Sequence, residues 1–390
     1  MLAQIGGSGD ITSLIIWFVF PLLLFMMLPR MMSAQTVLKL EKETRELDAM
    51  AISSREKIAR AVTKRPAAIR DRMRDFMDFF MVSPIGADPY GIVRKIDLVV
   101  RQSDKRFRWF VNQLAPRLNA DESANVRNAL EGAMMVHQIA KVVRHYLELV
   151  RKYKMYQIGM IIQMQLPLIH RMAKAAEAAT DAFLEGTPIG DGIGPLIVAR
   201  LMQNKPHVFV DEEFAVAKAR IANRNVLIAK ASGPGASTGY PGKFLLKLTK
   251  DEKINRIITI DAGLRLEGEK TGSVCEGVGV AMGGSGVDRY EIEEFAVSHN
   301  IPLDAVVVKV NEEEALSAMT KEVLAAVSKA TSTMEEAVKR SDRKDKILIM
   351  GVGNTCGIGN SKASVKEAED KIKKAALKVK PEKKKSIFPW

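Results

Sequence analysis

Hydrophobic positions along the chain follow two patterns, and the change between them falls near residue 186. Before it, apolar residues recur every three or four positions between charged ones over long stretches, as in amphipathic helices. After it, short runs rich in Val and Ile alternate with glycine-rich turns and helical stretches. This alternation is typical of a parallel sheet with crossover helices. The pattern therefore predicts an all-helical domain followed by an α/β domain.

The helical part divides into two predicted segments. Residues 33–82 are highly charged and predict a helical stalk, which the pair Arg65-Pro66 interrupts. Its apolar residues recur at near-heptad spacing: Val37, Leu40, Leu47 and Met50. Such a seam is typical of a short coiled coil, through which the chain could form a homo-oligomer. Residues 83–186 follow as the helical domain.

The α/β domain is predicted to span residues 187–370. Four of its apolar runs read as buried strands: RNVLIAKA, INRIITIDAG, LDAVVVKV and KILIMGVG. Helical patterns separate the last three, as crossover connections between parallel strands require. Residues 371–390 form a predicted Lys-rich tail, with eight lysines in its first fifteen residues.

Residues 1–32 predict a membrane anchor. The run Ile11–Pro29 holds no charge over 19 residues, about the length that crosses a ~30 Å hydrocarbon layer. Asp10 precedes the run and no small-residue cleavage site follows it, unlike in a secretory signal. Basic residues just beyond it place the bulk of the chain in the cytoplasm. We therefore predict a single transmembrane helix in the cell membrane; a buried helix of a soluble protein is the alternative.

Composition and charge narrow the choice of partners. The 390 residues are 47% hydrophobic and carry a net charge of +13. Such a charge favours polyanionic neighbours, either anionic lipid headgroups or RNA and the ribosome. The two cysteines are too few for a disulfide framework, and no Cys/His cluster has zinc-site spacing.

Five glycine-rich stretches punctuate the second half. They are GTPIGDGIGP (186–195), SGPGASTGYPG (232–242), DAGLRLEGEKTGSVCEGVG (261–279), GGSG (283–286) and GVGNTCGIG (351–359). Loops that follow the carboxyl ends of parallel strands gather at one edge of the sheet, where ligands bind. Glycine leaves backbone N–H groups uncovered, and such groups bind anions at strand–loop–helix junctions. We therefore expect these loops to converge on one ligand site.

Acidic residues supply the candidate chemistry at this edge. Asp261 closes a predicted strand, and three glutamates follow it as further catalytic candidates: Glu267, Glu269 and Glu276. Carboxylates near backbone donors suit metal-assisted hydrolysis of a phosphate or peptide bond, with Asp261 and a glutamate holding a divalent metal ion. Asp191 is another candidate, although an N-cap or turn aspartate would give the same pattern.

Ligand-binding candidates come from the same loops. They are Gly351, Gly353, Asn354, Thr355, Lys270, Thr271, Gly272, Gly277 and Asp191. At Gly353 we expect a larger side chain to fill space that a ligand atom occupies. Cys275 and Cys356 each lie in a glycine loop, as nucleophiles or simply as small residues. P-loop, dinucleotide-binding and HExxH motifs are absent from the sequence.

Several stretches together resemble an archaeal family of membrane-anchored proteins, domain of unknown function family 1512. They include DPYGIVRKID, KVVRHYLELVRK, QMQLPLI, GTPIGDGIGPLIVARLM, TIDAGLRLEGEKTGSVCEGVGVAMGG and MGVGNTCGIGN. This resemblance implies a cytosolic helical domain followed by an α/β domain. Three shorter pieces, ILIMGVGN, GDGIGPLIVARL and IITIDAG, are similar to parts of the hydrogenase-maturation and germination protease fold. That similarity implies a circular permutation and carries over Asp261 as a metal-binding aspartate.

Two functions fit these observations. In the first, a membrane-anchored α/β domain binds, and in one interpretation hydrolyses, a phosphate-bearing or peptide ligand at its glycine loops. In the second, the chain is a non-enzymatic membrane scaffold that docks the ribosome, RNA or anionic lipid through its basic helical domain and tail.

Overall fold

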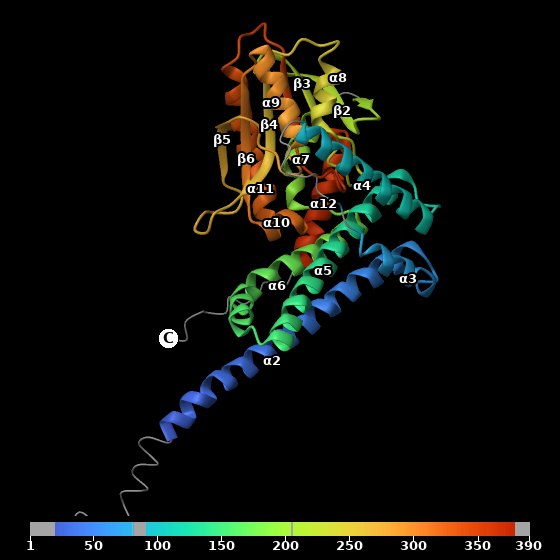
Figure 1. Ribbon diagram of the computed structural model, residues 1–390. Coiled ribbons are helices and arrows are strands. Elements are labelled where there is room, and N and C mark those ends of the chain that lie inside the picture. The colour runs from blue at the N-terminus through green and yellow to red at the C-terminus, as the bar shows by residue number, and fades with distance from the viewer. Residues whose placement is uncertain (1–19, 80, 82–90, 204–205, 379–390) are drawn as a thin grey trace, which may run out of the picture.

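The computed structural model of the chain describes residues 20–79, 81, 91–203 and 206–378. Figure 1 shows a helical part, from which α2 projects, beside a part built on a β-sheet. The helices of the first part are α2 (Phe20–Val62), α3 (Ala67–Phe76), α4 (Ile92–Leu114), α5 (Ala120–Tyr153) and α6 (Tyr156–Glu185). The predicted order, a helical region followed by an α/β domain, is confirmed.

Local sequence signals explain where the helices begin and end. Asn119 caps α5: its side chain accepts from the backbone N–H of Glu122, whose own side chain accepts from the N–H of Asn119. Pro66 lies between the end of α2 and the start of α3, as the proline break predicts. In α2, Leu40 and Leu47 are buried against α5 and α6. The near-heptad seam of the predicted stalk therefore packs within this chain.

The second part contains one mixed sheet rather than the parallel sheet that the apolar runs predicted. Its strands are β1 (His207–Phe209), β2 (Phe214–Ile221), β3 (Arg224–Ala231), β4 (Arg256–Leu264), β5 (Val274–Val278), β6 (Leu303–Val310) and β7 (Ile347–Gly351). They lie in the order β1-β2-β3-β7-β4-β6-β5. The central four are parallel and coincide with the four predicted strands, whereas β1, β2 and β5 pair antiparallel at the edges.

Helices cover both faces of this sheet (Figure 1). They are η2 (Gly190–Gly192), α7 (Ile193–Leu201), α8 (Pro241–Leu248), α9 (Val287–His299), α10 (Glu312–Leu316), α11 (Lys321–Lys339) and α12 (Lys362–Lys378). Alternate residues of β7 point to opposite sides: Ile347 and Ile349 pack in a core with α7, α11 and α12, while Leu348 and Met350 pack with α8 and α9. Both faces are apolar because both are covered.

The chain leaves two neighbouring central strands towards opposite faces. After β7 it continues to α12, and after β4 it runs through β5 to α9 on the other face. In open α/β sheets, a crevice forms where chains diverge in this way at the carboxyl ends of adjacent strands, and ligands bind there. The fold therefore directs attention to the ends of β4 and β7.

The two termini bear on the predicted anchor and tail. Residues 1–19, which hold the first part of the predicted span Ile11–Pro29, lie outside the described residues. Among the helices that are described, none combines the length and apolar character needed to cross a membrane. Residues 379–390 of the predicted tail also lie outside the described residues, and α12 continues into the tail as far as Lys378.

Candidate functional site

A cavity of about 320 Å³ lies at the carboxyl ends of β4 and β7. Each of the five glycine-rich loops contributes to its wall, which includes Asp191, Thr238, Gly239, Tyr240, Asp261, Gly283, Gly284, Ser285, Gly286, Val352 and Gly353. Loops that are far apart in sequence therefore meet at one place. Three of them follow the parallel strands β3, β4 and β7, which end at one edge of the sheet, whereas 186–195 follows α6 and 283–286 follows β5.

Asp191 and Asp261 form a pair of carboxylates in this cavity. Asp261 is only 4% exposed, and its side chain accepts a 2.7 Å hydrogen bond from the N–H of Ala262. Burial raises the pKa of Asp261 well above its usual value, and the negative charge of Asp191 raises it further. Burial also raises the pKa of Asp191, although a 2.8 Å bond from the N–H of Asn354 opposes this. Neither aspartate forms an ion pair with any described residue.

Close backbone packing fixes Asp191 beside the end of β7. A Cβ at Gly353, where φ is +125°, would lie 2.0 Å from the carbonyl oxygen of Asp191. Similarly, a Cβ at Gly194 would lie 2.2 Å from the carbonyl oxygen of Ile260. Gly353 is therefore required by protein packing, and the expectation that it leaves room for a ligand atom is wrong. Gly351 follows the same rule, since its Cβ would meet the carbonyl oxygen of Gly194 at 2.4 Å.

Thr355 and a buried lysine hold the neighbouring loop in place. The Thr355 hydroxyl donates to the carbonyl oxygen of Gly235 at 2.8 Å. Lys230, fully buried on β3, donates through Nζ to the carbonyl oxygen of Ala231 at 2.9 Å and to Oδ1 of Asn360 at 2.8 Å. Burial lowers the pKa of this lysine to about 7. Both side chains therefore support the cavity without lining it.

The three glutamates that follow Asp261 in sequence lie elsewhere. Glu269 pairs with Lys309, and Glu276, on β5, pairs with Arg340 at the far edge of the sheet. Glu267 lines a different cavity, beside α10. The chain turns away from the cavity after β4 and returns as an antiparallel edge strand, which separates these glutamates from Asp261.

The other candidates between residues 270 and 277 share this position. The Thr271 hydroxyl donates to Oε1 of Glu314 at 2.6 Å, and the N–H of Gly272 donates to the carbonyl oxygen of Lys309 at 2.8 Å. The carbonyl oxygen of Lys270 accepts a hydrogen bond from Ser273, and Gly277 lies in β5. The structure does not bring these residues to the aspartate pair.

Sequence reasoning missed further acidic residues of the cavity wall. Asp97 and Arg101, four positions apart in α4, form an ion pair at 2.7 Å, and such pairs are ordinary on helix surfaces. Asp288, at the start of α9, accepts a 3.0 Å bond from the N–H of Gly242, and burial raises its pKa. The wall thus holds four aspartates and one arginine. Asp288 lies between two of the glycine-rich stretches in the fold, 232–242 and 283–286. That position was the signal that could have identified it.

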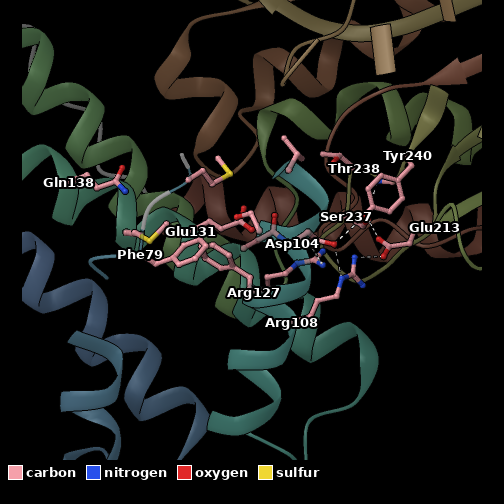
Figure 2. Close-up of a pocket in the computed structure, with 17 residues that line it drawn as sticks. Phe79, Asp104, Arg108, Arg127, Glu131, Gln138, Glu213, Ser237, Thr238 and Tyr240 are labelled. Carbon is pink, nitrogen blue, oxygen red and sulfur yellow. Dashed lines mark hydrogen bonds and ion pairs between the residues drawn. The ribbon is translucent and has the colours of Figure 1, made fainter. Parts of the chain in front are cut away.

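A larger cavity, of about 450 Å³, lies between the helical part and the sheet part (Figure 2). Four of its charged residues, Asp104, Arg108, Arg127 and Glu213, form a connected network in Figure 2. Asp104 pairs with Arg108 and with Arg127, at 2.8 and 2.9 Å, and accepts from the hydroxyl of Tyr240 at 2.7 Å. Arg108 also pairs with Glu213, which accepts from the hydroxyl of Ser237.

The cysteines do not fit a nucleophilic role. Cys356 is buried, and burial raises the pKa of its thiol to about 12, so the reactive thiolate is scarce at neutral pH. Cys275 is exposed on β5, an edge strand of the sheet. The interpretation as a small loop residue is therefore favoured for Cys356, whereas Cys275 lies in a strand.

The fold and its cavity define a class of protein: a helical part joined to an α/β part with an acidic crevice at its strand ends. The family models agree on a single family. The "Protein of unknown function (DUF1512) N-terminal domain" matches residues 14–186, and the "Domain of unknown function (DUF1512) C-terminal" matches residues 189–359. The chain belongs to the DUF1512 family. No curated protein and no solved structure matches it.

Proposed function

We propose that this protein is a hydrolase in which Asp191 and Asp261 hold a divalent cation and act on an amide bond of a peptide ligand. The observation that carries the proposal is the pair formed by the buried Asp261 and the partly exposed Asp191, which has raised pKa values and no basic partner among the described residues. Structural carboxylates are usually paired when they are buried, and pairs with raised pKa values are concentrated at functional sites.

The charge of the cavity favours a peptide over a phosphate-bearing ligand. Four aspartates and a single arginine line it, and that arginine already pairs with Asp97. A free phosphate would meet repulsion from these carboxylates. The glycine loops were expected to hold an anion, yet the acidic side chains between them favour neutral or cationic groups. A peptide amide is neutral and can accept and donate hydrogen bonds.

The aspartate pair fits a hard divalent cation such as Mg²⁺ or Mn²⁺. Two carboxylates that share one buried place need a proton or a cation to offset their repulsion. Asp191 is oriented by the N–H of Asn354 and Asp261 by the N–H of Ala262, so one oxygen of each is fixed. A cation bound there would act as a Lewis acid towards the amide carbonyl. Without a cation, the protonated member of the pair would donate to that carbonyl instead.

The alternative scaffold function has less support from the described surface. On α5, the basic strip that could meet a polyanion includes His137, Lys141 and Arg144. The first two lie within hydrogen-bonding distance of Asp78, and Arg144 pairs with Asp48. Paired bases offer less charge to RNA or anionic lipid. We retain the predicted membrane anchor as part of the proposal, with the cavity on the cytoplasmic side.

Peptide hydrolysis by the full-length protein tests the proposal. A defined mixture of peptides is incubated with Mg²⁺, Mn²⁺ or Zn²⁺, or with EDTA, and new termini are identified by mass spectrometry. We expect cleavage that needs a divalent ion and falls at least about 100-fold in Asp191→Asn and Asp261→Asn. Asp211→Asn, which changes a side chain that is 89% exposed, serves as the matched control.

The outcomes separate the two functions. Cleavage that persists in Asp261→Asn, or no cleavage with any ion, would overturn the hydrolase proposal. Salt-sensitive co-sedimentation with ribosomes that does not change in Asp261→Asn would support the scaffold instead. Cleavage that continues in EDTA but is lost in both aspartate variants would show that a proton shared by Asp191 and Asp261, and not a metal ion, supports the reaction.

A further inference from the structure

A carboxylate of the helical part also faces the site. Glu131, on α5, lines the cavity of Figure 2 and a third cavity, of about 330 Å³. Asp191 lies in the wall of this third cavity and also in the wall of the cavity that Asp261 lines. Glu131 is an exposed residue, and desolvation of its carboxyl group by the surrounding protein raises its pKa.

The bases near Glu131 are already used by other acids. Arg127 pairs with Asp104 at 2.9 Å, and Arg108 pairs with Asp104 and with Glu213. No hydrogen bond or ion pair joins the Glu131 carboxylate to any described residue. Glu131 is therefore the one acid of the Figure 2 network region that lacks a direct partner in the described chain.

The third cavity is apolar apart from a few polar groups. Its apolar wall consists of Met135, Ala176, Ala179, Phe183, Ile189, Ala315 and Leu316. Its polar groups are the carboxylates of Glu131 and Asp191 and the amides of Asn128 and Asn354. A hydrocarbon stem that ends in a positive charge matches this combination, because the stem is buried against apolar walls while the charge meets a carboxylate.

We propose that Glu131 recognises the basic side chain, arginine or lysine, of a peptide whose backbone lies at the Asp191–Asp261 pair. This inference rests on the proposed function and adds its specificity. In this arrangement the helical part binds the side chain of the peptide, and the α/β part hydrolyses its backbone amide bond. A guanidinium donates two parallel hydrogen bonds to a carboxylate, so arginine is the better match. The carboxylates of Glu131 and Asp191 both line this apolar cavity, so it disfavours an acidic side chain.

Binding of three matched peptides tests the inference. The probes are Ac-Leu-Arg-Leu-NH2, Ac-Leu-Gln-Leu-NH2 and Ac-Leu-Glu-Leu-NH2, measured by calorimetry with EDTA present so that metal-dependent cleavage is prevented. The wild-type protein is expected to prefer the arginine peptide over the glutamine peptide by about tenfold or more. Glu131→Gln should remove that preference, and Glu131→Arg should favour the glutamate peptide. Glu148→Gln, on the same helix but paired with Arg151 at the surface, should keep the wild-type order.

The result distinguishes this inference from the proposed function. An unchanged preference in Glu131→Gln, or no preference in the wild type, would overturn the role of Glu131. Because glutamine keeps the size of the side chain, this variant decides the question even where Glu131→Arg fails to fold. Loss of the preference in Glu131→Gln together with full cleavage by Asp261→Asn would uphold recognition by Glu131 and overturn the hydrolase.

Discussion

The Asp104 network and the Asp191–Asp261 pair line neighbouring cavities of this fold. Their surroundings shift the pKa values of their acids in opposite directions. At Asp104, burial opposes ionisation, but the positive charges of Arg127 and Arg108 and a bond from Tyr240 outweigh it and lower the pKa. At Asp261, burial acts with the charge of Asp191 and raises the pKa. The same desolvation therefore gives opposite protonation behaviour, and the presence of a cationic partner decides which.

This difference indicates different roles. The Asp104 network joins α4 and α5 of the helical part to Glu213, Ser237 and Tyr240 of the sheet part, with each charge satisfied. Such a network fixes how two parts of a chain meet. The aspartate pair contributes no comparable link and has no cationic partner among the described residues, as is common at binding and catalytic sites. The predictions that follow test whether the two clusters differ as described.

Removing the positive charge of Arg127 from the Asp104 network should have the largest effect on stability. Arg127→Met leaves the half-buried Asp104 with one fewer partner, and Arg127 itself is only 7% exposed. We expect a loss of about 3–5 kcal/mol in the free energy of unfolding, measured by urea denaturation. The exposed Arg144→Met, which breaks a surface pair with Asp48, should cost less than about 1 kcal/mol. Equal, small losses would show that the network does not stabilise the fold.

Shifting the aspartate pair without changing its charge should have the next effect. Gly353→Ala places a Cβ against the carbonyl oxygen of Asp191 at a φ of +125°. Strain and overpacking together should cost about 2–4 kcal/mol. The control is Gly277→Ala on β5, where no atom lies within 4 Å of the added Cβ. Thermal unfolding of both variants measures the difference, and a Gly353→Ala variant as stable as Gly277→Ala would contradict the packing described here.

Neutralising one acid in each cluster should change stability in opposite directions. Below about pH 4, the unfolded pKa of aspartate, Asp261 is protonated in both states, and its contribution is lost as the pH rises through its raised folded pKa. Asp261→Asn should therefore stabilise the metal-free protein at pH 7. The contribution of Asp104 is present above about pH 4 and is lost as the pH falls through its lowered pKa, so Asp104→Asn should destabilise. Destabilisation by Asp261→Asn at pH 7 would contradict the comparison.

The smallest expected effect on stability belongs to Lys230, a buried lysine that has no carboxylate partner among the described residues. Its folded pKa is lowered to about 7, whereas the unfolded value is about 10.4. Its contribution is present above the unfolded pKa and is lost as the pH falls through the folded pKa. Between pH 7 and 8 the wild type should gain about 1 kcal/mol of stability relative to Lys230→Met. Parallel stability curves for the two proteins would show that Lys230 is charged in the fold.

Much of the fold could be predicted from apolar patterning. The four Val/Ile-rich runs became the parallel strands β3, β4, β6 and β7, because a strand covered on both faces must be apolar throughout. The antiparallel edges were missed. β2 alternates buried and exposed residues only in its second half, and β5 is short and largely exposed, so neither has the composition of a buried strand.

The candidate site was predictable only where a residue closes a strand or a loop that the topology brings to one edge. Asp261 and Asp191 satisfy that condition. Glu267, Glu269 and Glu276 do not, because proximity in sequence is lost when the chain leaves the sheet edge. Glu131 belongs to a different part of the chain, and its position on an amphipathic helix gives no signal that distinguishes it from a surface glutamate.

A Mn²⁺ titration by calorimetry tests the central claim most directly, since an uncompensated aspartate pair should bind a cation that the paired network cannot. We expect one site in the full-length wild-type protein, weakened at least about tenfold by Asp191→Asn and by Asp261→Asn. Among the described residues, the one cluster of three potential ligands is Glu43, Glu46 and His170, where α2 meets α6. Glu43→Gln should therefore leave the site unchanged. Equal affinity in the wild type and both aspartate variants, or loss of the site in Glu43→Gln alone, would contradict the account.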